Sequence, residues 1–234
     1  MWAGVADHLM KIASYAVRNQ GTLAGNLMLK HAHNDFPSDV FLTLATVGAV
    51  LEVIGPAGAL EEVAVADLPG HNMDRKLIAR IKLPELAETP KEKAAAAKKD
   101  INSLWRKSGG SADERHLGTA GATSPTWIYR SFKVMPRSSN AHAYVNAGFL
   151  GLVDSADHFR LVGRPSLVFG GISAGLVHAS ATEAFLQDRP MDDHGIFLEA
   201  LAILAEELVP DEDPVLASPL YRKQLAMGLF YKVA

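Results

Sequence analysis

Apolar residues recur at helical spacing near the start of the chain and at strand spacing further along. The spacing predicts a helix over residues 1–17. Its apolar face would hold Val5, Leu9, Ile12, Ala13 and Ala16. Residues 18–26 and 30–39 are rich in polar residues and glycine and are typical of loops. After them the pattern predicts a helix over residues 40–49 and strands over residues 50–54, 60–65 and 77–83.

The C-terminal part of the chain changes its apolar period from two to about 3.6. Strands are predicted over residues 128–135, 141–153 and 166–172, and helices over residues 180–187 and 196–208. Ser218 is expected to cap a last helix that begins at Pro219. The residues of this helix expected to face the core are Tyr221, Leu225 and Leu229. Strands followed by helices predict an α+β layer pair.

The segment between these two parts has a different composition. Residues 85–116 hold seven Lys or Arg and six Asp or Glu with little apolar periodicity, although residues 94–97 favour a short exposed helix. The composition predicts a flexible insertion over residues 85–126.

Composition excludes several classes of protein. The net charge of −3 in 234 residues is too small to indicate binding to nucleic acid or to an anionic membrane surface. Cysteine is absent, which excludes disulfides and cysteine-ligated iron–sulfur or zinc centres within the chain. No apolar run of about 18 residues predicts a membrane-spanning helix, and the N-terminus does not resemble a signal peptide. We expect a cytoplasmic protein.

Two segments could hold a ligand. Residues 21–26 (GTLAGN) offer backbone N–H groups, the Thr22 hydroxyl and the Asn26 amide, a set that can wrap a diphosphate or ribityl chain. An ordinary helix-to-strand turn has the same composition, so both interpretations stay open. His31 and His33 lack a third ligand at a familiar spacing, and we predict no metal site.

Five motifs together resemble the FAD-binding segment of the molybdenum hydroxylases, the xanthine dehydrogenase and aldehyde oxidase family. VRNQGTLAGN resembles the family's second flavin-contacting loop, QVRNxxTLGGN, except that Ala24 stands where the family has glycine. The other matching segments, in family order, are FPSD, RSFKVMPR, NAHAYVNAGF with VFGGIS, and SPLYRKQLAMGLFYK. The spacing before FPSD is closest to insect-type aldehyde oxidases.

The resemblance implies a set of FAD contacts. In the matching loop they are Thr22, Gly25 and Asn26, preceded by Tyr15 and Ala16. Tyr15 packs on a ring of the cofactor or is a core aromatic.

Three further contacts are implied outside this loop. Asp39 would accept a hydrogen bond from the flavin or ribityl chain, and it also fits as the N-cap of the following helix. Ile78 would lie against the isoalloxazine ring or be a buried strand residue. Lys133 would stand near the flavin, where a cation favours the anionic reduced form, or be an exposed strand lysine. Arg137 would support the loop after that strand.

The resemblance also implies an architecture. Residues 1–84 would be the C-terminal half, or second subdomain, of a PCMH-type FAD-binding domain. Residues 127–234 would be the flavoprotein C-terminal subdomain, a three-stranded antiparallel sheet with three helices. The family's earlier diphosphate loop, GNTxxG, has no counterpart here, so we expect FAD binding to be weak or absent in the isolated chain.

Two interpretations of function follow. In the first, the chain is the FAD-binding fragment of an aldehyde oxidase-like protein. That parent would be a homodimer with 2Fe-2S centres and molybdopterin that this chain does not bind, and it would pass electrons through FAD to oxygen or NAD. In the second, the chain is a truncated, non-catalytic product with at most a structural or interaction role. No residue is predicted to be a catalytic acid or base, and whether the chain is itself an enzyme stays open.

Overall fold

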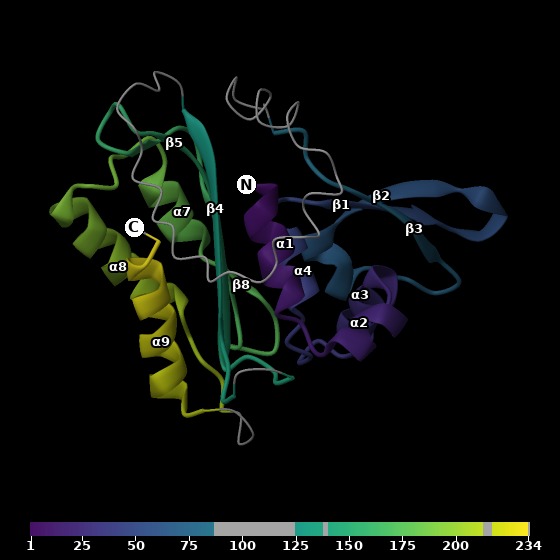
Figure 1. Cartoon of the computed structure of the whole chain (residues 1–234). Coiled ribbons are helices and arrows are strands. Elements are labelled where there is room, and N and C mark those ends of the chain that lie inside the picture. Colours follow the sequence, from purple (N-terminus) through teal and green to yellow (C-terminus); the bar gives the residue numbers. More distant parts are fainter. Residues whose placement is uncertain (87–124, 138–139, 213–216, 234) are drawn as a thin grey trace.

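The computed structural model describes residues 1–86, 125–137, 140–212 and 217–233. They form two units, and the first packs against one face of the long sheet of the second (Figure 1). The first unit begins with four helices: α1 (Trp2–Met10), α2 (Tyr15–Gln20), α3 (Leu23–Ala32) and α4 (Asp39–Thr46). A small antiparallel sheet of order β2-β1-β3 follows. Its strands are β1 (Val50–Ile54), β2 (Leu60–Ala64) and β3 (Leu77–Lys82), with 3-10 turns η1 (Pro56–Gly58) and η2 (Val65–Gly70). The three strands predicted here are confirmed.

The second unit is an antiparallel sheet of order β4-β5-β7-β8, with β6 paired to β5. Its strands are β4 (Thr126–Val134), β5 (Val145–Asp154), β6 (Arg160–Leu161), β7 (Ser166–Gly170) and β8 (Val177–His178). Its helices are α7 (Ser180–Leu186), α8 (His194–Glu207) and α9 (Pro219–Tyr231). The three long strands and three helices are confirmed, whereas β6 and β8 have two residues each, too few for a periodic pattern.

The central strand β5 is buried on both faces, because α7 and α9 pack on one side of the long sheet and α1 and α4 on the other (Figure 1). Side chains alternate between these sides along the strand. Those in the second unit's core are Val145, Ala147 and Phe149. Those that meet the first unit are Asn146, Gly148 and Leu150. The strand therefore joins the two cores.

Helix α4 approaches β5 most closely at Gly148. A Cβ atom added there would collide with the side chain of Thr46, a residue 1% exposed. Glycine is required at this point because no larger residue leaves room for the helix.

Two local predictions in the first unit are wrong. The single helix over residues 1–17 is two helices, broken where Ala13 has a φ of 47° and where Arg18 Nη1 donates to the Ile12 carbonyl at 2.6 Å. The loop over residues 18–26 is the end of α2 and the start of α3, joined at Gly21 and Thr22. The cap that Thr22 provides explains why a glycine-rich segment is helical. The loop predicted from residue 30 begins only after α3 ends.

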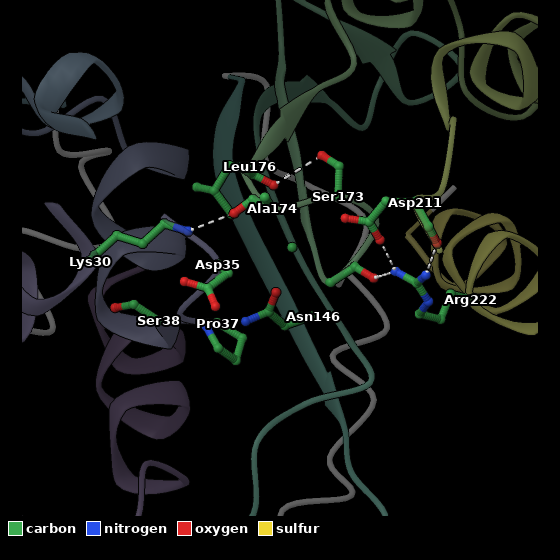
Figure 2. A pocket seen from close by; sticks show the side chains of 13 residues that line it. Lys30, Asp35, Pro37, Ser38, Asn146, Ser173, Ala174, Leu176, Asp211 and Arg222 are labelled. Carbon is green, nitrogen blue, oxygen red and sulfur yellow. Dashed lines mark hydrogen bonds and ion pairs between the residues drawn. The ribbon is translucent and has the colours of Figure 1, made fainter. Parts of the chain in front are cut away.

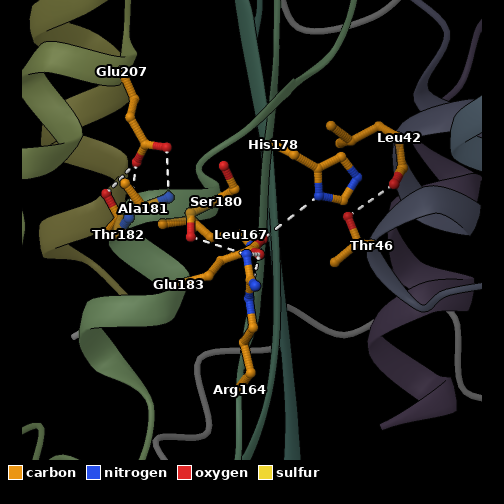
Figure 3. Close-up of polar contacts among 10 residues, drawn as sticks. All are labelled: Leu42, Thr46, Arg164, Leu167, His178, Ser180, Ala181, Thr182, Glu183 and Glu207. Atoms are coloured by element: carbon orange, nitrogen blue, oxygen red, sulfur yellow. Dashed lines mark hydrogen bonds and ion pairs between the residues drawn. The ribbon is translucent and has the colours of Figure 1, made fainter.

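Helix α7 takes its N-terminal cap from α8 (Figure 3). Glu207 accepts hydrogen bonds from the N–H groups of Ala181 and Thr182 at 2.7 and 2.9 Å, and from the Thr182 hydroxyl at 2.6 Å. Glu183 on the same helix accepts from Leu167 N–H at 2.8 Å and from Arg164 at 3.1 Å. Glu207 thus joins α7 to α8, and Glu183 holds α7 to the sheet.

The last helix begins as predicted, with Ser218 as its cap and Pro219 in its first turn. Tyr221 is 46% exposed, so the prediction that it faces the core is wrong. Arg222 is fully buried instead, because its guanidinium donates to the carbonyls of residues 171, 172, 211 and 217 and to the Asp211 carboxylate. Most of the predicted insertion, including the short helix over residues 94–97, lies outside the described residues.

Candidate functional site

The start of α3 is capped by its own side chain and open to solvent. Thr22 Oγ1 accepts a hydrogen bond of 2.9 Å from Gly25 N–H, and Asn26 N–H donates to the Thr22 carbonyl at 3.0 Å. The first-turn N–H groups of Leu23 and Ala24 therefore have no intrahelical acceptor. Because Thr22 and Gly25 are exposed, an anionic oxygen can reach this turn.

The small residues of this turn have local structural reasons. A Cβ atom at Gly25 would stand 2.8 Å from Thr22 Oγ1, so only glycine leaves the cap undisturbed. Ala24 is partly buried and packs against the first core. Its methyl group has a place in the fold, which explains how the chain tolerates alanine at this point.

A hydrogen-bonded path leads from α3 to α4. Asn26 Oδ1 accepts a hydrogen bond of 2.5 Å from Ser38 Oγ, and Ser38 Oγ accepts one of 3.0 Å from Phe41 N–H. Ser38 is therefore the N-cap of α4. The alternative in which Asp39 caps this helix is wrong, since Asp39 is its first residue.

Asp39 is the centre of a buried polar cluster, which we call the Asp39 cluster: His8, Asp39, Lys133 and Asn146. Its Oδ2 lies 2.7 Å from Lys133 Nζ, and its Oδ1 accepts from Asn146 Nδ2 at 2.8 Å and lies 3.3 Å from His8 Nε2. The side chains of Lys133 and Asp39 are 3% and 5% exposed. Lys133 is thus not an exposed strand lysine. The cluster unites residues of α1, α4, β4 and β5.

The surroundings of Asp39 favour its ionised form. Burial alone would raise the pKa of Asp39, but hydrogen bonds from His8, Lys133 and Asn146 and the charge of Lys133 outweigh it, so the pKa lies below its usual value. Burial also raises the pKa of Tyr129 on β4, and the nearby Asp39 carboxylate acts in the same direction.

Four buried polar atoms have no hydrogen-bond partner within the described part of the chain. They are His8 Nδ1, Thr43 Oγ1, Tyr129 Oη and Asn146 Oδ1. Two of them belong to residues that contact Asp39. Buried polar atoms normally have hydrogen-bond partners. Polar atoms without such partners beside an ion pair are compatible with the binding of a polar ligand.

The other predicted contacts lie apart from the Asp39 cluster. Tyr15 and Ala16 are exposed on α2, and Tyr15 is 75% exposed, so it is not a core aromatic. Ile78 is 8% exposed in the first core and pairs with Val53 of β1. None of the hydrogen bonds or ion pairs among the described residues links these three positions to the cluster. Arg137 donates to the Asn140 carbonyl and supports its own loop, as predicted.

Three residues of the site were not predicted as site residues: His8, Ser38 and Asn146. His8 and Asn146 lie 31 and 107 positions from Asp39, so no local spacing reveals them. The alternation on β5 offered one signal, since a polar Asn146 stands on a strand whose other residues are almost all buried.

A small cavity of about 50 Å³ lies beside the cluster, between the two units (Figure 2). Lys30 and Arg222 line it with Asp35 and Asp211. Burial lowers the pKa of Lys30, opposed by Asp35, and Lys30 Nζ donates to the carbonyls of residues 34 and 174. Because Lys30 and Arg222 already donate to protein acceptors, the lining of the cavity does not favour a charged ligand.

Within the described residues, no three His, Cys, Asp or Glu side chains could together hold a metal ion. His31 Nδ1 lies 2.9 Å from the Leu68 carbonyl, a contact that anchors α3 to η2. No helix in the described part of the chain is both long and apolar enough to cross a membrane.

Two family models match this chain, and both describe domains of flavoproteins. The FAD binding domain of molybdopterin dehydrogenases matches residues 1–86, and the CO dehydrogenase flavoprotein C-terminal domain matches residues 130–234. The chain belongs to the molybdenum hydroxylase family, of which it represents the FAD-binding flavoprotein domains.

Related proteins agree with this assignment. Indole-3-acetaldehyde oxidase and abscisic-aldehyde oxidase, both from Arabidopsis thaliana, are each 28% identical over 98% and 97% of this chain. The chain spans about 15% of the length of either relative. The narrower resemblance to insect-type aldehyde oxidases stays a prediction, because these relatives are plant proteins.

Solved structures share the fold. CO dehydrogenase from Oligotropha carboxidovorans has a TM-score of 0.66 at 17% identity, with 95% of this chain and 63% of that chain covered. Quinoline 2-oxidoreductase from Pseudomonas putida 86 has a TM-score of 0.66 at 20% identity, with 97% and 64% covered. At this identity the likeness concerns the fold alone.

Proposed function

We propose that this chain forms one wall of an FAD site, with Thr22, Gly25 and Asn26 as direct contacts at the start of α3. The observation that carries the proposal is the open first turn of α3, which Asn26 and Ser38 join to the Asp39 cluster. Free N–H groups at a helix start suit the oxygens of a diphosphate. When bound, FAD supplies the electron transfer.

The remaining predicted contacts take different parts in this proposal. Tyr15 and the backbone at Ala16 are exposed and free to meet the cofactor directly. Asp39 and Lys133 are buried, so they act from behind the surface as an ion pair that fixes the wall. Ile78 gives apolar support from β3.

We further propose that the whole protein is aldehyde oxidase-like. It would relay electrons from iron–sulfur centres through FAD to oxygen or NAD, as a cytoplasmic homodimer with iron–sulfur and molybdenum domains. The support is the similarity to plant aldehyde oxidases over nearly the whole chain.

Titration of the chain with FAD, followed by quenching of flavin fluorescence, tests the proposed site. Asn26→Ala removes an amide contact and should weaken binding about fivefold, equivalent to about 1 kcal/mol. Gln20→Ala, at an exposed position only six residues away, should leave affinity unchanged. No saturable binding by the unaltered chain would favour the non-catalytic alternative, and equal affinities of all three proteins would show that the site lies elsewhere.

A further inference from the structure

His8 is a fully buried polar residue on α1 that no predicted contact includes. Its exposed fraction is 0%, and the described residues give its side chain one polar contact, from Nε2 to Asp39 Oδ1 at 3.3 Å. Buried imidazoles are costly unless a partner compensates their desolvation. The position would favour an apolar residue if packing were its only task.

The contact with a carboxylate assigns the donor role to His8 Nε2. An ionised carboxylate only accepts hydrogen bonds, so His8 Nε2 carries a proton and donates the hydrogen bond to Asp39. Protonation of Nδ1 as well would leave a buried N–H with no acceptor among the described residues. The charges of Asp39 from α4 and Lys133 from β4 already balance, and the Tyr129 phenol is neutral. A His8 tautomer with a proton on Nε2 therefore fits these surroundings.

The donors around Asp39 define its orientation. Oδ1 accepts hydrogen bonds from His8 and Asn146, whereas Oδ2 pairs with the Lys133 ammonium group. Two donors to one oxygen restrict rotation of the carboxylate group, so the other oxygen points toward the Lys133 ammonium group. Loss of the His8 donor would leave Asn146 alone to set the orientation of Oδ1.

We propose that His8 is a positioning residue of the flavin site: its Nε2–H donates to Asp39 and thereby keeps the carboxylate aimed at Lys133. The inference rests on the proposed FAD site and extends it to α1. His8 itself does not touch the cofactor, and it acts through Asp39 on the wall that α3 and α4 present.

Three variants separate a positioning role from a structural one. His8→Leu removes the donor, His8→Gln offers an amide N–H near the position of Nε2, and Val5→Ala trims a buried α1 residue outside the cluster. Carbon-13 NMR titration of labelled aspartates measures the pKa of Asp39 without any cofactor. Fluorescence titration measures the FAD dissociation constant of the same proteins.

We expect the pKa of Asp39 to rise toward its ordinary value in H8L and to stay low in H8Q and V5A. The FAD dissociation constant should rise about tenfold in H8L, as for loss of a hydrogen bond to a charged group, and recover in H8Q. If H8L does not fold, H8N replaces it, because an asparagine amide nitrogen matches Nδ1 rather than Nε2.

Two results would overturn the inference. An Asp39 pKa in the donor-free variant that equals the value in V5A would show that His8 does not hold the carboxylate. Equal FAD affinity in the donor-free variant and V5A would contradict the inference alone. Absence of FAD binding by the unaltered chain would instead contradict the proposed function, and the inference with it.

Discussion

The start of α3 and the Asp39 cluster are linked through Ser38, which donates to Asn26 and directly precedes Asp39 in the chain, yet the two regions differ in almost every physical respect. Thr22 and Gly25 are exposed and belong to one short turn. Asp39 and Lys133 are buried side chains from two units, held by direct charge contact. Ser38 connects the two regions through Asn26.

The difference separates two tasks of a cofactor wall. Exposed N–H groups remain available to a ligand, and their residues can change with little effect on the fold. A buried ion pair offers little surface to a ligand, and its loss leaves an uncompensated charge between the units. Mutations should therefore affect binding in the first region and folding in the second.

The largest expected effect comes from Lys133→Met. Removing this partner leaves Asp39 buried without its cation, which should reduce the free energy of unfolding by about 3–5 kcal/mol. Lys82→Met offers a surface comparison, since the Lys82 side chain is 45% exposed in its ion pairs with Glu52 and Glu62. That variant should lose far less stability than Lys133→Met in urea denaturation. Equal losses in both variants would contradict the distinction between the two regions.

Gly148→Ala should have the next largest effect. The added methyl collides with Thr46 where α4 crosses β5, and overpacking of this kind costs about 1–3 kcal/mol. Gly228→Ala is the matched control, because a Cβ atom on this exposed residue of α9 meets nothing within 4 Å. It should stabilise the protein by up to about 1 kcal/mol. Thermal denaturation of both variants measures the contrast.

Acid should weaken the contact between the units through Asp39. The folded pKa of Asp39 lies below the ordinary aspartate value of 3.8. Its stabilising contribution is therefore present above that value and is lost as pH falls through the lower, folded pKa. Unfolding measured between neutral and acid pH should show a smaller loss in Asp39→Asn than in the unaltered chain. Glu183, whose pKa is also lowered despite its burial, contributes equally to both proteins.

The smallest expected effect on folding belongs to the exposed region. Thr22→Ala removes the cap of α3 and should reduce stability by about 1 kcal/mol, whereas Thr22→Ser keeps the hydroxyl and the cap. Chemical denaturation of the pair isolates the cap. A loss as large as that of Lys133→Met would mean that this turn is part of the core.

Periodicity predicted most of the fold, because the helices of the second unit carry apolar residues at helical spacing and its long strands β5 and β7 are apolar runs that are almost entirely buried. The periodic pattern failed where a single contact or backbone angle determines the local structure. The break at Ala13 depends on a left-handed backbone angle, and the helix after Gly21 depends on the Thr22 hydroxyl. Composition alone assigned that segment to a loop.

The site was predictable only in part. The family motif pointed to Thr22, Asp39 and Lys133, but it did not show that Asp39 and Lys133 form a buried pair. His8 and Asn146 complete that pair from distant elements, and only the packing of α1 and β5 against α4 brings them together.

Amide chemical-shift mapping of the labelled chain with added FAD tests the central claim most directly. The proposed wall predicts that the largest shifts fall on the N–H groups of Leu23, Ala24 and Gly25, with smaller shifts near Asp39. Residues at the far end of α9, such as Tyr231, should not move. Shifts that avoid the start of α3 at saturating FAD, or no shifts at all, would contradict the claim that this turn contacts the cofactor.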